Sequence, residues 1–367
     1  MKANVIHAFG PPENLKYETV SDPQPRAGEV RIRVHAATVN RVLDVSLRAG
    51  KEMFRGPVLP LIPGVDCAGV IDAIRGPVTG IDGSTINEGD RVVFFDVHRT
   101  CGRCRACTVH RTPTRCSSRR VFGITDSADE GLFGGWAQAI YMEPGVAMAQ
   151  LPEAVTLDDY IGGGCGLLTA VHMTERAEIR LGDAVVVQGT GAVGLSAIAL
   201  AHLAGASRII AIGAPEGRLA LAREMGAHVT LDLARTTVDE RRQAVLDATH
   251  GEGADVVLEA AGAAAAVPEG LDLARVGGRY VIAGHYTDAG PTTINVHHQI
   301  NRKHLEIRGC WGSEVRHFLR ALSILEAHPA IPFRKIGAKR YGLGQLNEAL
   351  ADAEALRIPK ALVDPWS

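Results

Sequence analysis

The first part of the chain consists of short β-like segments separated by glycine and proline. Val30–Ala36 carries an apolar side chain at every second position, which is the period of a strand with one buried face. Residues 67–71 and 90–95 are further segments rich in β-branched and aromatic side chains, and turn-forming residues flank them. This pattern predicts a β-rich N-terminal region.

From Gly182 onward the pattern changes. Ala184–Val187 is entirely apolar, as expected for a strand buried on both faces of a parallel sheet, and a helix-like stretch follows over residues 195–204. Short strands and helices then alternate, which predicts an α/β fold with a doubly wound parallel sheet. The further expected strands are 208–212, 229–231, 255–259, 279–283, 305–308 and 360–363, and the further expected helices are 218–225 and 315–325.

The composition is that of a soluble protein with two domains. The chain has 367 residues, of which 46% are hydrophobic and 22% charged, and this provides material for two cores. A formal net charge of −2 argues against binding to nucleic acid, which requires clustered positive charge. No segment approaches the ~20 apolar residues of a membrane helix, and residues 1–7 lack the apolar core of a secretory signal. We therefore expect a cytoplasmic protein without a membrane partner.

A glycine-rich turn predicts a dinucleotide site. Residues 188–194 read Gln-Gly-Thr-Gly-Ala-Val-Gly, which fits G-x-G-x-x-G between an apolar strand and a helix. In such a turn Gly189 permits the tight bend, Gly191 lets the backbone approach a pyrophosphate, and Gly194 allows close packing of the helix. The free N–H groups at the helix start bind the phosphates. The expected cofactor contacts are Gly189, Thr190, Gly191, Ala192, Val193 and Gly194.

The adenosine end of this predicted site leaves NAD and NADP open. The motif calls for an acidic residue about 20 positions further on, which accepts hydrogen bonds from the ribose. Gly213 stands there instead, and its lack of a carboxylate permits a 2′-phosphate. Glu216 could still reach a ribose and Arg218 could bind a phosphate, although both could equally be solvated charges at a helix start.

A cysteine cluster predicts a metal site. Cys101, Cys104, Cys107 and Cys116 have the spacing C-x2-C-x2-C-x8-C. Four thiolates so close together can enclose a zinc ion with no open coordination position, which is the geometry of a structural site. Iron–sulfur ligation is the alternative, but the proline that usually follows the last cysteine is absent. We expect the nearby His98 and His110 to be solvated loop residues.

These features, in this order, resemble the zinc-containing medium-chain dehydrogenase/reductase superfamily of the alcohol dehydrogenase type. The resemblance covers essentially the whole chain, and the segments that carry it are 89–92, 101–116, 134–137, 164–170, 189–194 and 277–279. It implies a GroES-like β-domain over residues 1–164 that contains the zinc lobe, a Rossmann domain over 165–308, and a return to the first domain over 309–367. It also implies a homodimer or homotetramer, and places Thr169, Val193, Gly284 and His285 beside the nicotinamide.

The resemblance fails at the catalytic zinc. The family usually supplies a Cys in the first domain, a His in a Gly-His-Glu motif and a second Cys, and of these only the last is present, as Cys165. Residues 39–44 contain no cysteine, and Gly64-Val65-Asp66 stands where Gly-His-Glu is expected. A catalytic zinc needs about three protein ligands and one open position. We therefore expect the structural zinc to be retained and the catalytic zinc to be lost.

The loss of the catalytic zinc changes the expected chemistry. Residues 44–50 resemble the corresponding stretch of zinc-free quinone and enone reductases of the same superfamily, in which hydride addition places negative charge on an enolate oxygen that hydrogen-bond donors can stabilise. The candidate groups are Asn40 or Arg41 as donors, Asp66 as base or orienting group, and Cys165 as a thiol lining the pocket. Asp66 could equally serve only to orient neighbours, and Cys165 could be an inert buried side chain.

Three functions follow, in order of preference. The first is an NAD(P)H-dependent oxidoreductase without catalytic zinc, which reduces an activated C=C or C=O of a small organic substrate. The second is a zinc-type alcohol or polyol dehydrogenase whose metal is held by an unusual set that includes Cys165 and Asp66. The third is a non-enzymatic nicotinamide-binding protein. Metal content separates the first two, since they predict one and two zinc ions per chain.

Overall fold

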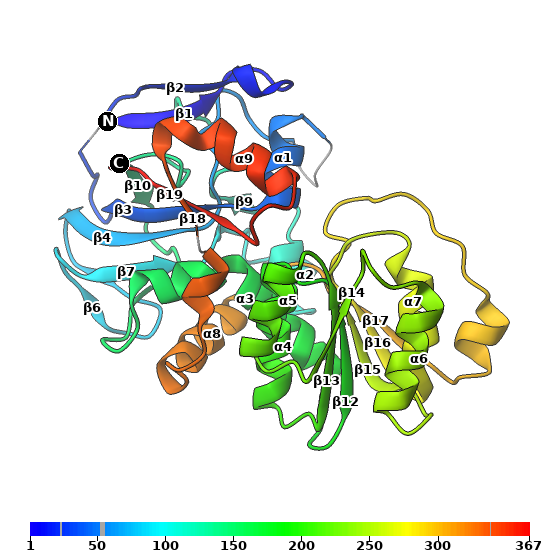
Figure 1. Ribbon diagram of the computed structural model, residues 1–367. Helices are drawn as coiled ribbons and strands as arrows, with labels where there is room; N and C mark the ends of the chain where they lie inside the picture. The colour runs from blue at the N-terminus through cyan, green and yellow to red at the C-terminus, as the bar shows by residue number, and fades with distance from the viewer. Residues whose placement is uncertain (23, 52–55, 338) are drawn as a thin grey trace. The chain divides into compact units, whose positions relative to one another are not determined.

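The computed structural model describes residues 1–22, 24–51, 56–337 and 339–367 (Figure 1). These form two compact units. The first comprises residues 1–164, 314–329 and 337–367, and the second comprises residues 165–313 and 330–336. Each unit has its own sheet and its own core.

The first unit is built on a seven-stranded sheet in the order β11-β7-β4-β3-β19-β18, with β10 paired to β3. Its long strand β3 buries Val30, Ile32 and Val34, while Arg33 and His35 between them are exposed, as the alternating pattern predicts. The strands of this sheet are β3 (Val30–Val39), β4 (Cys67–Ile74), β7 (Arg91–Phe94), β10 (Ala139–Met142), β11 (Met148–Gln150), β18 (Lys339–Gly342) and β19 (Ala361–Asp364).

Smaller elements complete the first unit. Helix α9 packs its apolar face on the same core as β3 and β19, and the buried Trp136 lies in this core. The paired short strands are β1 (Lys2–Ile6) with β2 (Leu15–Thr19), β5 (Val78–Thr79) with β6 (Thr85–Ile86), and β8 (Val97–Arg99) with β9 (Arg120–Val121). The helices are α1 (Arg41–Arg48), α2 (Arg105–Thr108), α8 (Val315–Ala327) and α9 (Leu346–Glu354), with 3-10 turns at Pro12–Asn14, Pro113–Arg115 and Leu343–Gln345.

The second unit is a six-stranded parallel sheet in the order β14-β13-β12-β15-β16-β17. Its strands are β12 (Ala184–Gln188), β13 (Arg208–Gly213), β14 (Val229–Asp232), β15 (Ala254–Glu259), β16 (Ala274–Ile282) and β17 (Glu306–Gly309). Helices α4 (Ala192–Leu203) and α5 (Glu216–Glu224) cover one face, and α6 (Val238–Ala248) and α7 (Ala266–Leu273) cover the other (Figure 1). A single turn of π-helix, Val296–Asn301, precedes β17.

This sheet confirms the predicted α/β fold with a doubly wound parallel sheet. Its strand order reverses between β12 and β15, because the chain runs outward through β13 and β14 and then returns to the other side of β12. At such a switch point the loops after two neighbouring strands diverge and leave a crevice for a ligand. The glycine turn of residues 189–194 follows β12 at this point.

Helix α3 (Leu157–Ala177) is broken at Gly164, whose φ of 51° and ψ of −144° are not helical. An ideal Cβ at Gly164 would overlap the Asp66 carboxylate and lie 2.5 Å from Lys360 Nζ, so no larger residue fits this bend. The first unit ends at this residue, and the second begins at Cys165.

The return to the first unit comes later than the sequence suggested. We expected it at residue 309, but the second unit continues to Ser313. The backbone N–H of Cys310 donates to Ile282 O (2.8 Å), and the Trp311 indole donates to Tyr286 O (3.0 Å). These bonds extend the edge of the parallel sheet beyond β17, so the chain leaves this unit only after they are made.

Among the described residues, no helix has both the length and the apolar composition needed to cross a lipid bilayer.

Candidate functional site

The glycine turn has the geometry that a dinucleotide requires. Gly189 has a φ of 105°, and a Cβ there would lie 2.7 Å from Ala260 O. A Cβ at Gly194 would overlap Gly189 O, so α4 can approach β12 closely only because this residue is glycine. By contrast, no atom of the described residues lies within 4 Å of a Cβ built on Gly191, the N-cap of α4. The space in front of the helix N-terminus is therefore open to a phosphate.

The other predicted contacts of this crevice lie around the same turn. Gly166 packs closely on the start of α4: a Cβ there would lie only 2.9 Å from Ala192 Cβ. This turn of α3, three residues before Thr169, therefore lies against Ala192 and Val193. The Thr169 hydroxyl donates to Cys165 O (2.9 Å). Gly284 and His285 follow β16, and the Nε2 atom of His285 is buried without a hydrogen-bond partner among the described residues.

The adenosine end contains no carboxylate at the end of β13. Gly213 has no room for one, since its Cβ would overlap the hydroxyl of Thr190, a buried group without a hydrogen-bond partner among the described residues. Glu216 is exposed and paired with Arg223, so its carboxylate is already engaged by a cation. Arg218 is buried, which argues against the alternative of a solvated charge at this position.

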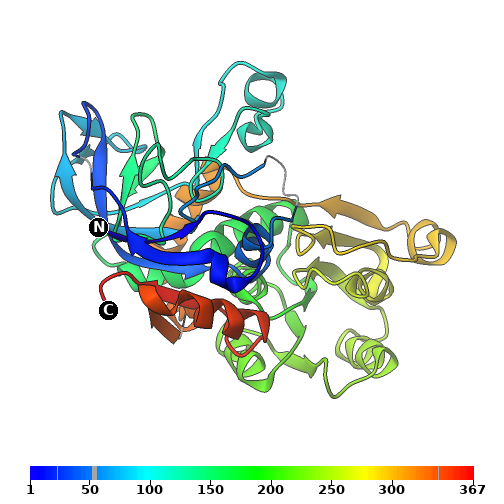
Figure 2. The same cartoon turned by 90° about the horizontal axis from the view of Figure 1, so that it is seen from above.

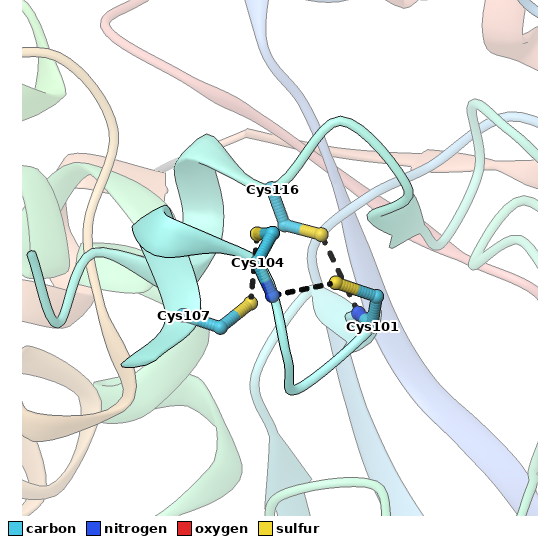
Figure 3. A group of neighbouring side chains, drawn as sticks. All are labelled: Cys101, Cys104, Cys107 and Cys116. Atoms are coloured by element: carbon cyan, nitrogen blue, oxygen red, sulfur yellow. Dashed lines mark hydrogen bonds between the residues drawn. The ribbon is translucent and has the colours of Figure 1, made fainter. Parts of the chain in front are cut away.

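The four cysteines converge on one point (Figure 3). Their sulfur atoms all lie within 4.8 Å of one another, and this is the one such group of His, Cys, Asp or Glu side chains found among the described residues. Backbone N–H groups point at the sulfurs: that of Cys104 at Cys101 Sγ (3.4 Å) and that of Ser118 at Cys116 Sγ (3.3 Å). Four thiolates in this arrangement fit a tetrahedral zinc ion.

The environment of the cysteine cluster shifts the pKa of two of its thiols in opposite directions. Hydrogen bonds from the Arg103 and Cys104 backbone lower the pKa of Cys101 from 9.0 to about 6. Burial raises the pKa of Cys107 to about 11, and a bound cation would hold that sulfur as a thiolate. The lobe that carries these residues projects from its own unit (Figure 2).

His98 is not a solvated loop residue. Its side chain is fully buried, its Nε2 atom lies 3.0 Å from Asp126 Oδ2, and its ring stacks on Phe122 with centroids 4.3 Å apart. His110 is exposed, as expected. Strand β8 turns His98 inward, and the carboxylate of Asp126 supplies the hydrogen-bond partner that a buried imidazole requires.

A second polar cluster lies in the first unit, around Asp66. Lys360, 2% exposed, lies immediately before β19, and its Nζ atom is 3.2 Å from Asp66 Oδ2. The same ammonium group donates to Ile161 O and Gly163 O, both at 3.2 Å, in the turn where α3 breaks. An ammonium group has three donors, and here each has an acceptor. The cation is therefore held firmly beside the Asp66 carboxylate.

Asn40 and Asp66 are joined through Thr38. The Thr38 hydroxyl donates to Asp66 Oδ2 (3.3 Å), and the Asn40 amide donates to Thr38 Oγ1 (3.2 Å). Strand pairing of β3 with β4 aligns these residues, and the indole of Trp136 fixes the strand end through a bond to Thr38 O (2.9 Å). The structure thus brings two of the predicted catalytic residues into one network.

The remaining candidates lie elsewhere. Arg41 is exposed at the first position of α1. Cys165 is partly exposed and is the first residue of the second unit. Sequence reasoning missed Lys360 altogether, because a lysine before a short apolar segment gives no sign that its partner is 294 residues away.

Asp44 is a further buried carboxylate beside this cluster. Its Oδ2 atom accepts from the Asn40 backbone N–H (2.6 Å) across the first turn of α1, while Oδ1 has no hydrogen-bond partner among the described residues. Burial raises the pKa of Asp44 from 3.8 to about 7, and the charge of Asp66 adds to this, whereas Lys360 opposes it. Asp44 therefore exchanges a proton near neutral pH.

Comparison with known proteins decides the family. A family model described as "Alcohol dehydrogenase GroES-like domain" matches residues 26–153, and one described as "Zinc-binding dehydrogenase" matches residues 192–327. The chain is 31% identical to 5-exo-hydroxycamphor dehydrogenase of Pseudomonas putida, over 94% of this chain and 93% of that protein. It is 27% identical to L-threonine 3-dehydrogenase of Bacillus subtilis, over 94% of this chain and 93% of that protein.

A solved structure agrees with these matches. The crystal structure of an alcohol dehydrogenase from Thermotoga maritima superposes with a TM-score of 0.92 at 31% identity, and the match covers 99% of this chain and 98% of the other. The chain belongs to the zinc-containing medium-chain dehydrogenase/reductase superfamily.

As a medium-chain dehydrogenase/reductase, the chain is an NAD(P)-dependent oxidoreductase. The relatives named above are dehydrogenases, which speaks against the third alternative of a non-enzymatic binding protein. The open space at Gly191 fits the cofactor of this superfamily, and the four thiols fit its zinc.

The open space at Gly191 leads to the first prediction. Gly191→Val places a side chain where the pyrophosphate is expected, and we expect at least a hundred-fold loss of NAD(P)H affinity with the fold retained. Fluorescence titration and the melting temperature measure the two effects. Gly309→Val is the matched control, because a Cβ there also meets open space but lies at the end of β17. Unchanged cofactor affinity in Gly191→Val would contradict the assigned turn.

The cysteine site leads to the second prediction. Cys104→Ser removes one of four thiolates, and because metal binding is coupled to folding we expect loss of zinc and a melting temperature lowered by several degrees. Elemental analysis and calorimetry test this. Cys310→Ser, at a buried cysteine of the second unit, is the control for zinc content. A Cys104→Ser protein that keeps its zinc and its melting temperature would refute the site.

Asp44 leads to the third prediction. Its pKa is higher in the folded protein than the ordinary 3.8, so folding binds a proton between pH 4 and 7, and this contribution to stability is lost as the pH rises to about 7. Asp44→Asn keeps an oxygen acceptor for Asn40 but cannot ionise. We expect the variant to gain stability relative to wild type as the pH rises from 4 to 7, by up to about 1.4 kcal/mol per pH unit, with no further gain above pH 7. Parallel unfolding curves in both proteins would show that Asp44 titrates normally.

Proposed function

We propose that this protein transfers a hydride from NAD(P)H to an activated C=C or C=O of a small organic substrate without a catalytic zinc, and that the cysteine lobe holds a structural zinc. The observation that carries the proposal is the buried pairing of Lys360 with Asp66. Asp66 stands where the superfamily has the acidic residue of its Gly-His-Glu motif, and its charge is balanced by an ammonium group.

The donor chemistry around Asp66 supports this proposal. A catalytic zinc takes soft or imidazole ligands, usually three from the protein. Val65 precedes Asp66, in the place of the histidine, and Thr38 and Asn40 supply a hydroxyl and an amide. A second cation beside Lys360 would also be repelled by the fixed ammonium charge. Hydroxyl and amide groups suit the binding of an oxygen that gains negative charge, as in an enolate.

We assign a separate role in the reaction to each polar residue of this cluster in the first unit. Bound NAD(P)H supplies the hydride. Asn40 is the candidate donor to the substrate oxygen, and Thr38 holds its amide in place. Asp44 exchanges a proton near neutral pH and lies on the same turn as Asn40, so we assign it the supply of a proton to the network. Asp66 orients Thr38, and the Lys360 ammonium group donates to its carboxylate.

The cofactor remains either NAD or NADP. Gly213 offers no carboxylate to repel a 2′-phosphate, and Glu216 is engaged by Arg223, so both features permit NADP. Arg218, the cation nearest in sequence, is buried. The homodimeric or homotetrameric state and the cytoplasmic location stay predictions.

The relatives favour a second candidate. Hydroxycamphor and threonine, in the names of two relatives, both carry a hydroxyl group, which suggests alcohol oxidation at a catalytic metal. In this protein the metal would need Cys165 and Asp66 among its ligands. Removal of the hydroxyl proton is the step for which such a metal is required, because a hydride leaves readily only from the alkoxide.

Zinc stoichiometry separates the two candidates and is the fourth prediction. We expect one zinc ion per chain in the purified protein, the same content in Cys165→Ser, and reduction of enones by NADH or NADPH in both. The two serine variants form a matched pair, since Cys104→Ser removes the zinc and Cys165→Ser does not. Two zinc ions in wild type and one in Cys165→Ser, together with oxidation of secondary alcohols, would establish the second candidate instead.

A further inference from the structure

A buried carboxylate in the second unit has no role in the chemistry described so far. Glu259, the last residue of β15, has an exposed fraction of 0%, and β15 pairs with β12 at the point where the strand order reverses. An ionised side chain at such a depth is unfavourable unless it is fully hydrogen-bonded. Its partners therefore reveal what the side chain is for.

The partners of Glu259 are backbone N–H groups from two different loops. Oε1 accepts from Ala261 N (2.8 Å) and Gly262 N (2.6 Å), in the loop that follows β15. Oε2 accepts from Gly284 N (3.0 Å), in the loop that follows β16. One carboxylate thus joins the carboxyl ends of two neighbouring parallel strands, and charge-assisted bonds of this kind are roughly twice as strong as neutral ones.

The two loops touch closely around this carboxylate. A Cβ at Gly284 would lie 2.6 Å from Glu259 Oε1 and 2.8 Å from Ala261 N, and one at Gly262 would overlap Gly284 O. The loop after β15 also lies against the phosphate turn, since Ala260 N donates to Gln188 O (2.8 Å). The Glu259 bonds therefore fix the walls of the crevice on the side away from β13.

That side receives the nicotinamide half of the cofactor. The pyrophosphate lies at the turn after β12 and the adenosine ribose at the end of β13, so the other mononucleotide must extend over β15 and β16. His285, next to Gly284, has its buried Nε2 atom without a partner among the described residues. A polar group in that position is satisfied when a ligand provides an acceptor or a donor.

We propose that Glu259 is a positioning residue for the nicotinamide half of the cofactor. It holds Ala261, Gly262 and Gly284 in the arrangement that the nicotinamide ribose and ring require, and it places the His285 imidazole beside them. This assignment rests on the dinucleotide-dependent function proposed above. It bears on the nicotinamide half, because the three N–H groups that bind its carboxylate lie in the loops after β15 and β16.

The experiment compares ligands that contain one or both halves. Glu259→Gln keeps the size of the side chain, but its amide presents an N–H group to backbone N–H donors. For this variant we expect about ten-fold to hundred-fold weaker binding of NADH, or of NADPH if wild type prefers it. ADP, or its 2′-phosphate, contains the adenosine and the pyrophosphate but not the second ribose, and should bind within two-fold of wild type. The blue shift of bound NADH fluorescence should also be reduced.

Glu269→Gln is the matched control. Glu269 is another buried carboxylate of the same unit, and it accepts from Arg241 Nε (2.6 Å) on α6. Its loss should lower the melting temperature without separating the affinities for NADH and ADP. Equal weakening of both ligands in Glu259→Gln, or no weakening of either, would overturn the positioning role. If wild type bound neither ligand, the dinucleotide-dependent function itself would fail.

Amide hydrogen exchange of the wild type covers the case in which Glu259→Gln does not fold. We expect NADH, but not ADP, to slow the exchange of the Ala261, Gly262 and Gly284 amides by at least several-fold, because only NADH has a nicotinamide half to cover these loops. Equal protection by both ligands, or by neither, would contradict the proposal.

Discussion

The buried ammonium group of Lys360 is the constraint on which the first unit depends. It joins three distant parts of the chain: the segment before β19, the residue before β4, and the turn where α3 breaks. The break at Gly164 leaves helix carbonyls without their usual N–H donors, and the ammonium group satisfies two of them. Loss of one partner from a buried pair costs about 3–5 kcal/mol, so this interaction resists change.

The same interaction explains how the chemistry of the site differs from that of a metal centre. The Asp66 carboxylate is buried, and the Lys360 ammonium group lies 3.2 Å from it, so a cation within the protein balances its charge. Thr38 and Asn40 can then serve as hydrogen-bond donors and acceptors. Neutral donors stabilise an oxygen that becomes negative only during the reaction, whereas zinc is needed most when a hydroxyl must lose its proton first.

The sequence predicted the fold well, because the decisive signals are local. Alternation in Val30–Ala36 and the apolar segment Ala184–Val187 each identify a strand from its own residues. The glycine turn was equally easy to predict, since its spacing is local and backbone geometry at nearby residues requires glycine at Gly189 and Gly194. Interactions between residues far apart in the sequence could not be predicted from the local pattern. Lys360 shows no periodicity, and the burial of His98 depends on Asp126 and on an aromatic cluster. The extension of the second unit to Ser313 likewise depends on hydrogen bonds to Ile282 and Tyr286.

A structural zinc in the cysteine lobe would serve the fold whether or not a catalytic metal is bound. Thr114, inside the lobe, donates through its hydroxyl and its backbone N–H to Glu314, and Arg119 donates to Thr114 O. Glu314 is the N-cap of α8 and the first residue after the chain returns from the second unit. A metal that orders the lobe would therefore also order the point of return. A metal ion used only in the reaction can be replaced by other polarising groups, whereas one that fixes the path of the chain contributes to folding itself.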